Sequence, residues 1–151
     1  GVRTFEAAAF LRRCGADVTR VRKMFREHVE DYRAKGEAIR NAELFREHFA
    51  ISVCPSEGLD SPTVVGAQAA NELLNIIGIK ASFVLTEYND KIYISSRSID
   101  EINVQIIMEK LGGGGHLNVA GAQLTGVTIV QAKRMIQDTL DEMLKEGDIE
   151  E

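Results

Sequence analysis

The sequence has few cysteines, no excess of positive charge and no long apolar run. Cys14 and Cys54 are its two cysteines and form no CxxC pair, which argues against a zinc ribbon or a disulfide framework. We expect both to be buried free thiols. No apolar stretch is long enough to span a bilayer, and no signal segment opens the chain. We therefore expect this fragment to be soluble.

The charge balance argues against one class of partner. Lysine and arginine total 18, against 23 aspartates and glutamates, so the net charge is −5 and the pI is about 5.3. Proteins that grip long DNA or RNA usually have a basic face, because neutralising phosphates supplies most of their non-specific affinity. We expect no long duplex partner. A small phosphorylated ligand held by one or two local cations is compatible with this composition.

Motifs for metal or nucleophilic catalysis are also missing. His28 and His48 have no HxxxH or DxD partner spacing, and no GxSxG elbow occurs. A two-metal hydrolytic site needs a cluster of metal-ligating side chains, which this sequence does not display. We expect no catalytic residue, metal ligand or cofactor within the chain, and we assign no role to either histidine.

What the sequence does contain is a series of short helical and strand patterns. Residues 4–13 predict a helix, and residues 17–45 predict a charged helical stretch whose thin apolar stripe is typical of a connector. Periodicity then predicts strands at 49–54, 81–88, 91–96 and 122–125, and helices at 62–77, 99–111 and 128–146. This order predicts an α/β fold: a small mixed β-sheet flanked by helices and preceded by a helical connector.

Local signals refine these boundaries. Ser98 with Glu101, and Thr128 with Gln131, have the spacing of capping boxes and predict where two helices begin. The dipeptide 89–90 predicts the tight turn of an antiparallel hairpin. Residues 148–151 are expected to fray.

Four consecutive glycines, Gly112, Gly113, Gly114 and Gly115, precede His116 and form the strongest local signal. A helix needs one glycine at its C-terminal cap, not four. Consecutive glycines adopt positive φ without steric cost and let main-chain N–H groups converge on an anion, to which His116 would add a donor. The alternative is a flexible spacer. Spacers usually carry serine or other polar residues, whereas this run lies between segments that are expected to pack.

A second candidate site consists of Ser95, Ser96, Arg97 and Ser98, between a predicted strand and a predicted helix. A helix N-terminus has unpaired N–H groups and a positive potential, and arginine holds phosphate with paired hydrogen bonds. The alternative is an ordinary helix cap beside a solvated arginine. The predicted helix 99–111 joins this tetrapeptide to the glycine run, which favours one shared phosphate site.

Taken together, the two motifs resemble those of a known family. Residues 94–98, and residues 112–116 followed by Ala120-Gly121, resemble the C-terminal DHH-associated domain of DHH-family phosphoesterases. The resemblance covers residues 49–144, and segments 3–8 and 15–17 look like the end of the DHH catalytic domain.

Three further segments narrow the branch within that family. These segments are residues 41–43, 67–70 and 81–84. They resemble the GdpP-type cyclic di-AMP phosphodiesterases more than the RecJ or nanoRNase branches. Asn71 stands where those proteins carry an aspartate, and we assign it no ligand role.

The resemblance implies that the chain divides into three parts and that hydrolysis and substrate binding belong to different domains. Residues 1–17 would be a remnant of the DHH catalytic domain, 18–48 a helical connector, and 49–151 the substrate-binding domain. The longer parent would be membrane-anchored, with this domain facing the cytoplasm, and would hydrolyse cyclic di-AMP to linear pApA. Two Mn²⁺ ions would sit in a DHH domain upstream of Gly1. The glycine run, His116 and Arg97 with its serines would bind phosphate or nucleotide, and the piece alone would be inactive.

The implied partners are a cyclic dinucleotide or short oligonucleotide and the DHH domain of the same chain, and a homodimer is left open. One alternative function is the substrate domain of a nanoRNase-like or RecJ-like oligonucleotide exonuclease. Another is a non-catalytic nucleic-acid-binding module, since a related glycine-rich domain ends alanyl-tRNA synthetases. The acidic composition disfavours both. A third alternative is an oligomerisation domain in which the glycines form a hinge.

Overall fold

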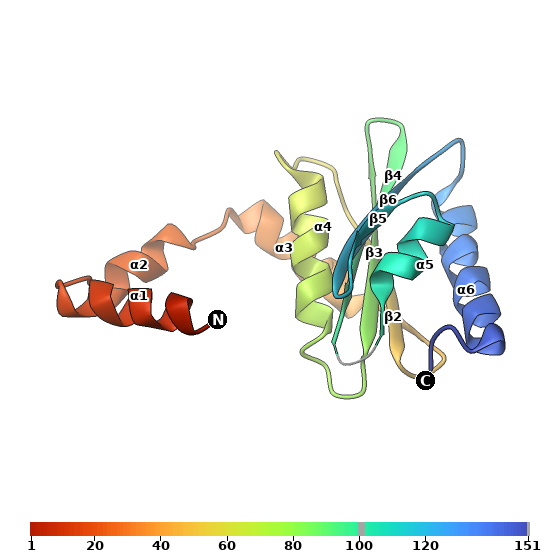
Figure 1. Ribbon diagram of the computed structural model, residues 1–151. Helices are drawn as coiled ribbons and strands as arrows, with labels where there is room; N and C mark the ends of the chain where they lie inside the picture. Colours follow the sequence, from red (N-terminus) through yellow and green to blue (C-terminus); the bar gives the residue numbers. More distant parts are fainter. Residues whose placement is uncertain (100–101, 151) are drawn as a thin grey trace.

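A mixed six-stranded sheet with helices on both faces forms the body of the computed structural model, which describes residues 1–99 and 102–150 (Figure 1). The strands are β1 (Glu43–Phe45), β2 (Phe49–Cys54), β3 (Ala81–Tyr88), β4 (Lys91–Ser98), β5 (Gly114–His116) and β6 (Val119–Thr125). The helices are α1 (Val2–Arg13), α2 (Val18–Met24), α3 (Val29–Arg40), α4 (Pro62–Leu73), α5 (Val104–Lys110) and α6 (Ile129–Glu146). The predicted α/β fold is confirmed.

The strand order is β1-β2-β3-β4-β6-β5. The β2–β3 pair is parallel and every other pair is antiparallel. α4 supplies the crossover that a parallel pair requires. Because β5 is an edge strand, one of its sides pairs with β6, and its other side has no neighbouring strand among the described residues.

Strand alternation builds two apolar layers. In β2, Phe49 and Ile51 face the larger core, which α5 and α6 cover, while Ala50 and Cys54 face the smaller core beneath α3 and α4. Figure 1 shows α4 on one side of the sheet and α5 and α6 on the other. β2 and β3 have the predicted bounds, and Asn89 makes the predicted turn with a positive φ.

α6 is the most regular helix, for reasons visible in the sequence. Thr128 and Gln131 form the predicted capping box, and Gly147 ends the helix with a φ of 78°. Four apolar residues along one stripe of the helix are fully buried: Ala132, Ile136, Leu140 and Met143. The expected fraying of residues 148–151 is wrong for Ile149, which packs into the larger core with 6% exposure.

The predicted helical stretch 17–45 is not one helix. It breaks between α2 and α3 at residues 25–28, and its end becomes strand β1. β1 forms because it pairs with β2, with Glu43 opposite Ile51, and because the Lys133 ammonium binds the Glu43 carboxylate at 2.9 Å. The β1–β2 turn carries Arg46 and Glu47 at positive φ. Neither residue type is typical of such a turn, so the sequence gives no sign of it.

Four other boundaries differ from prediction. β4 extends to Ser98 and β6 begins at Val119, because their ladder pairs Arg97 with Val119. α5 begins at Val104 with Asn103 as its cap, so Ser98 caps no helix, and Glu101 lies outside the described residues. α4 ends at Leu73 and continues to residue 76 as turns.

α1 and α2 lie apart from the sheet, and α3 connects them to it (Figure 1). Neither helix has a buried residue. Large apolar side chains on this arm are exposed: Val2, Phe5, Phe10, Leu11, Val18, Val21, Met24 and Phe25. None of the described helices is both long and apolar enough to cross a membrane.

Candidate functional site

The glycine run is an ordered part of the fold. Gly112 has a φ of 80°, and the N–H groups of Gly112 and Gly113 donate to Glu109 and Met108 carbonyls at the end of α5. These two N–H groups therefore belong to the helix end and do not converge on an anion. The chain then continues as β5, paired with β6. The structure does not support a flexible spacer.

Close packing of main chains explains three of the glycines in this region. A Cβ atom on Gly113 would lie less than 3.0 Å from the Gly121 carbonyl oxygen, and one on Gly115 equally close to the Val119 carbonyl oxygen. A Cβ on Gly121 would lie 2.8 Å from the Ile94 carbonyl oxygen. Real side chains do not tolerate such distances, so these positions need glycine for packing.

Gly114 is different. A Cβ atom added there meets nothing within 4 Å, and its φ is not positive. Neither sterics nor backbone conformation therefore requires glycine at this position. Gly114 pairs with Gly121, which in turn pairs with Ser95. The result is a row across three strands in which two of the three residues have no side chain.

The adjacent row brings the two strongest candidates to one face. Arg97 pairs with Val119, and Val119 pairs with His116. Directly opposed residues project from the same face of a sheet, so Arg97 and His116 share the face that carries Ser95. Two strand spacings, roughly 9–10 Å, separate their main chains. Long side chains can span that gap around a single ligand.

Arg97 is only partly exposed, and its Nη1 donates to the Ser96 carbonyl oxygen at 2.8 Å. Partial burial lowers the pKa of its guanidinium from the ordinary value. A cation that has lost part of its water gains from an anionic partner. His116 is exposed at the end of β5. Together they offer a guanidinium and an imidazole to an anion on this face.

Ser96 and Ser98 lie on the opposite face. Both are buried, at 0% and 5% exposure, on the side of the sheet that α5 and α6 cover. The Ser98 hydroxyl donates to the Ile102 carbonyl at 2.7 Å, and the Asn118 amide donates to the Ser98 hydroxyl at 3.1 Å. The Ser96 hydroxyl has no hydrogen-bond partner within the described residues. The sheet thus separates the predicted serine cluster, and Ser95 alone accompanies Arg97.

A groove of about 520 Å³ lies beside the Ser95–Gly121–Gly114 row. Its lining residues come from α4, β4, β6 and the end of α5: Thr63, Tyr93, Ile94, Ser95, Gly112, Gly113, Gly121, Ala122 and Gln123. Arg97 and His116 lie one row further along the sheet and do not line it.

Sequence reasoning missed Thr63, Tyr93 and Gln123. The sequence contains some indication of Tyr93, because every second residue of a strand lies on the same face, which places Tyr93 with Ser95 and Arg97. Only the register of β6, which pairs Gln123 with Tyr93, places Gln123 on this face.

The two cysteines differ in environment. Cys54 is buried, and burial followed by the negative charge of Glu37 raises the pKa of its thiol from 9.0 to about 11. A thiol that keeps its proton is a poor nucleophile. Cys14 is exposed, so the expectation that both are buried is wrong. It lies at the end of α1, where no residue is buried.

His28, His48 and Asn71 do not line this groove. His28 precedes α3 without a side-chain capping bond, the Nδ1 of His48 lies 2.9 Å from the Gly78 carbonyl, and Asn71 is exposed on α4. Within residues 1–99 and 102–150, no group of three or more His, Cys, Asp or Glu side chains is arranged to hold a metal ion.

Comparison with known proteins finds relatives that are similar in sequence and a solved structure that is similar in fold. The family model of the DHHA1 domain matches residues 48–146. The chain is 42% identical to the cyclic-di-AMP phosphodiesterase PdeA of Listeria monocytogenes, over 93% of this chain and 22% of that protein. It is 39% identical to the cyclic-di-AMP phosphodiesterase GdpP of Bacillus subtilis, over 97% of this chain and 23% of that protein.

The chain therefore spans less than a quarter of the length of these two relatives. A solved structure of an exopolyphosphatase-related protein from Bacteroides fragilis has the same fold, with a TM-score of 0.79 and 21% identity over 95% of this chain and 44% of that one. The family match covers strands β2 to β6, the glycine run and α6, and on this basis the chain belongs to the DHHA1 domain family.

Proposed function

We propose that this chain binds a phosphate of a cyclic dinucleotide and serves as the substrate-binding part of a cyclic di-AMP phosphodiesterase. The enzyme class is supported by the two bacterial relatives, which are named cyclic-di-AMP phosphodiesterases and are 42% and 39% identical to this chain in sequence. The observation that carries the binding role is the shared face of Arg97 and His116, next to a row whose glycines leave the main chain bare.

The proposed phosphate seat consists of Arg97, Ser95, Gly114 and His116. Arg97 supplies charge and His116 a second donor, while Gly114 lets an oxyanion approach the main chain without meeting a side chain. Main-chain N–H groups on the unpaired side of β5 add further donors. Ser96 and Ser98 take no part, because they are buried on the other face.

Hydrolysis belongs, in this proposal, to a DHH domain elsewhere in a longer protein. The described residues offer no metal cluster, and we assign the two Mn²⁺ ions and all catalytic residues to that domain. The chain's own contribution is positioning, since holding a reacting group in place removes much of the entropic barrier. We further propose that the longer protein is membrane-anchored and presents this domain to the cytoplasm.

Calorimetry of the chain with cyclic di-AMP tests the seat. Removing one charge-assisted contact to phosphate costs about 1.5–3 kcal/mol, so Arg97→Ala should raise Kd at least about 10-fold, and His116→Ala should raise it as well. Arg134→Ala removes an exposed arginine from α6 on the far face and should leave Kd unchanged. Equal Kd values for wild type and both site variants would contradict the proposal.

The same substitutions in the longer protein test the division of labour. Arg97→Ala and His116→Ala should slow hydrolysis of cyclic di-AMP while manganese content stays at the wild-type level, because neither residue would touch the metals. Loss of bound manganese in either variant would instead place that residue at the metal site.

A further inference from the structure

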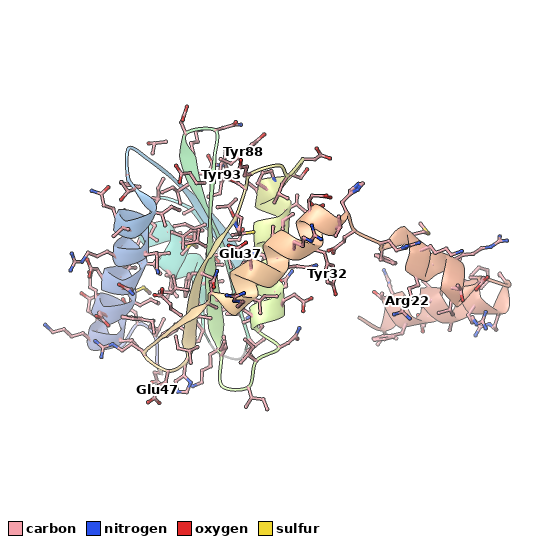
Figure 2. All side chains as sticks on the ribbon, turned by 180° about the vertical axis from the view of Figure 1, so that it is seen from behind. Arg22, Tyr32, Glu37, Glu47, Tyr88 and Tyr93 are labelled. Atoms are coloured by element: carbon pink, nitrogen blue, oxygen red, sulfur yellow. The ribbon has the colours of Figure 1, made fainter. Side chains whose placement is uncertain are left out.

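Tyr93 and Gln123 form a pair that the phosphate seat does not use. They are directly opposed on β4 and β6, so they project from the same face as Ser95 and Arg97. Both line the 520 Å³ groove. The tyrosine is half-buried and the glutamine exposed. Figure 2 labels Tyr93 near the β3–β4 turn, at the opposite end of β4 from Arg97.

The distances along β4 suit a nucleotide lying on the sheet. Successive residues on one face are roughly 6.5–7 Å apart, so Tyr93 lies one such step from Ser95 and two from Arg97. The intervening row contains Gly121 and Gly114, whose missing side chains leave room for a sugar. Thr63 of α4 and the main chain of Gly112 and Gly113 border the same space.

The chemistry of the pair matches a nucleobase. An aromatic ring stacks on the face of a base, which is worth about 1–3 kcal/mol per base. A glutamine amide has one acceptor and two donor hydrogens, and it pairs with adenine by accepting from N6 and donating to N7. The same edge of guanine offers two acceptors, O6 and N7, which one amide group cannot match as well. Within the described residues, neither the Tyr93 hydroxyl nor the Gln123 amide has a hydrogen-bond partner.

We propose that Tyr93 and Gln123 form an adenine subsite, with Tyr93 stacking on the base and Gln123 reading its edge. This inference rests on the proposed phosphate seat, because the seat sets where the base falls along β4. It assigns the choice of base to two strand residues, whereas Arg97 and His116 would bind the phosphate of any nucleotide.

Calorimetry of the chain with three probes tests the subsite: cyclic di-AMP, cyclic di-GMP and ribose 5-phosphate, which lacks a base. Tyr93→Ala and Gln123→Ala should each weaken cyclic di-AMP binding about 10-fold and leave ribose 5-phosphate binding unchanged. Tyr93→Phe should bind as wild type, because stacking needs the ring and not the hydroxyl. Tyr32→Ala is the matched control, since Tyr32 lies on α3, away from the groove (Figure 2).

Gln123→Arg gives the sharpest readout. A guanidinium only donates hydrogen bonds, so it loses the contact from adenine N6 and suits the O6 and N7 acceptors that guanine presents on the same edge. The variant should bind cyclic di-GMP more tightly than cyclic di-AMP, the reverse of wild type. The subsite would be overturned if Gln123→Arg kept the wild-type base preference and Tyr93→Ala kept the wild-type Kd, while Arg97→Ala still weakened binding. Failure of wild type to bind cyclic di-AMP would overturn the phosphate seat itself, and the subsite with it.

Discussion

At the scale of single residues, the four glycines of the run differ in why the position needs a glycine. Gly113 and Gly115 are glycine because a neighbouring main chain occupies the place of a side chain. Gly112 is glycine because the end of α5 needs a positive φ. Gly114 meets neither condition, and the proposed phosphate seat would account for its lack of a side chain.

This contrast gives a matched pair of substitutions. Gly115→Ala should lower the free energy of unfolding by about 1–3 kcal/mol, because the added methyl group overpacks against β6. Gly114→Ala should unfold close to wild type in denaturant, yet bind cyclic di-AMP more weakly, because its methyl group would occupy the seat. Chemical denaturation and calorimetry on both variants check this. Strong destabilisation by Gly114→Ala, or wild-type affinity in it, would show that the position is not reserved for a ligand.

At the scale of elements, β4 presents two different surfaces. Tyr93, Ser95 and Arg97 lie on the groove face, while Ile94, Ser96 and Ser98 are buried against the other layer. An interpretation of residues 95–98 as one cluster ignores this alternation, because consecutive residues of a strand point to opposite sides.

Ser98 is therefore a structural residue. Its hydroxyl joins the end of β4 to the segment before α5 and to the β5–β6 turn, through Ile102 and Asn118. Ser98→Ala should lower the free energy of unfolding by about 1–3 kcal/mol, because it leaves buried polar groups without partners. The Kd for cyclic di-AMP should stay within about twofold of wild type under native conditions. A Ser98→Ala variant that was as stable as wild type but had lost cyclic di-AMP binding would show that Ser98 belongs to the ligand site.

At the scale of the whole molecule, the chain divides into a packed body and an exposed arm. Residues 29–150 supply every buried residue of both cores, whereas α1 and α2 supply none. Apolar side chains such as Phe5, Phe10 and Met24 are exposed on the arm. Exposed patches of this kind mark interaction surfaces.

Deleting residues 1–26 should leave the thermal midpoint of the body unchanged, because no core contact is lost and the Lys35–Glu27 ion pair remains. Binding of a hydrophobic dye should fall, since the exposed apolar residues of the arm are gone. Circular dichroism melting and dye fluorescence on the two chains measure both effects. A midpoint several degrees lower in the shortened chain would show that the arm stabilises the body.

Local patterns in the sequence determined much of this protein. The bounds of β2 and β3, the 89–90 turn and the Thr128 cap of α6 follow from alternation, turn residues and a capping box, which act within a few residues of chain. The candidate status of Arg97 and His116 also came from short motifs. These features need no knowledge of distant partners.

Tertiary structure alone decided how those pieces meet. Strand register placed His116 two strands from Arg97 and set Gln123 beside Tyr93, and burial removed Ser96 from the groove face. Pairing with β2 turned residues 43–45 from predicted helix into strand. Register and pairing depend on contacts between segments far apart in the chain, and a shift of one residue would move every side chain to the other face. No local pattern carries that information.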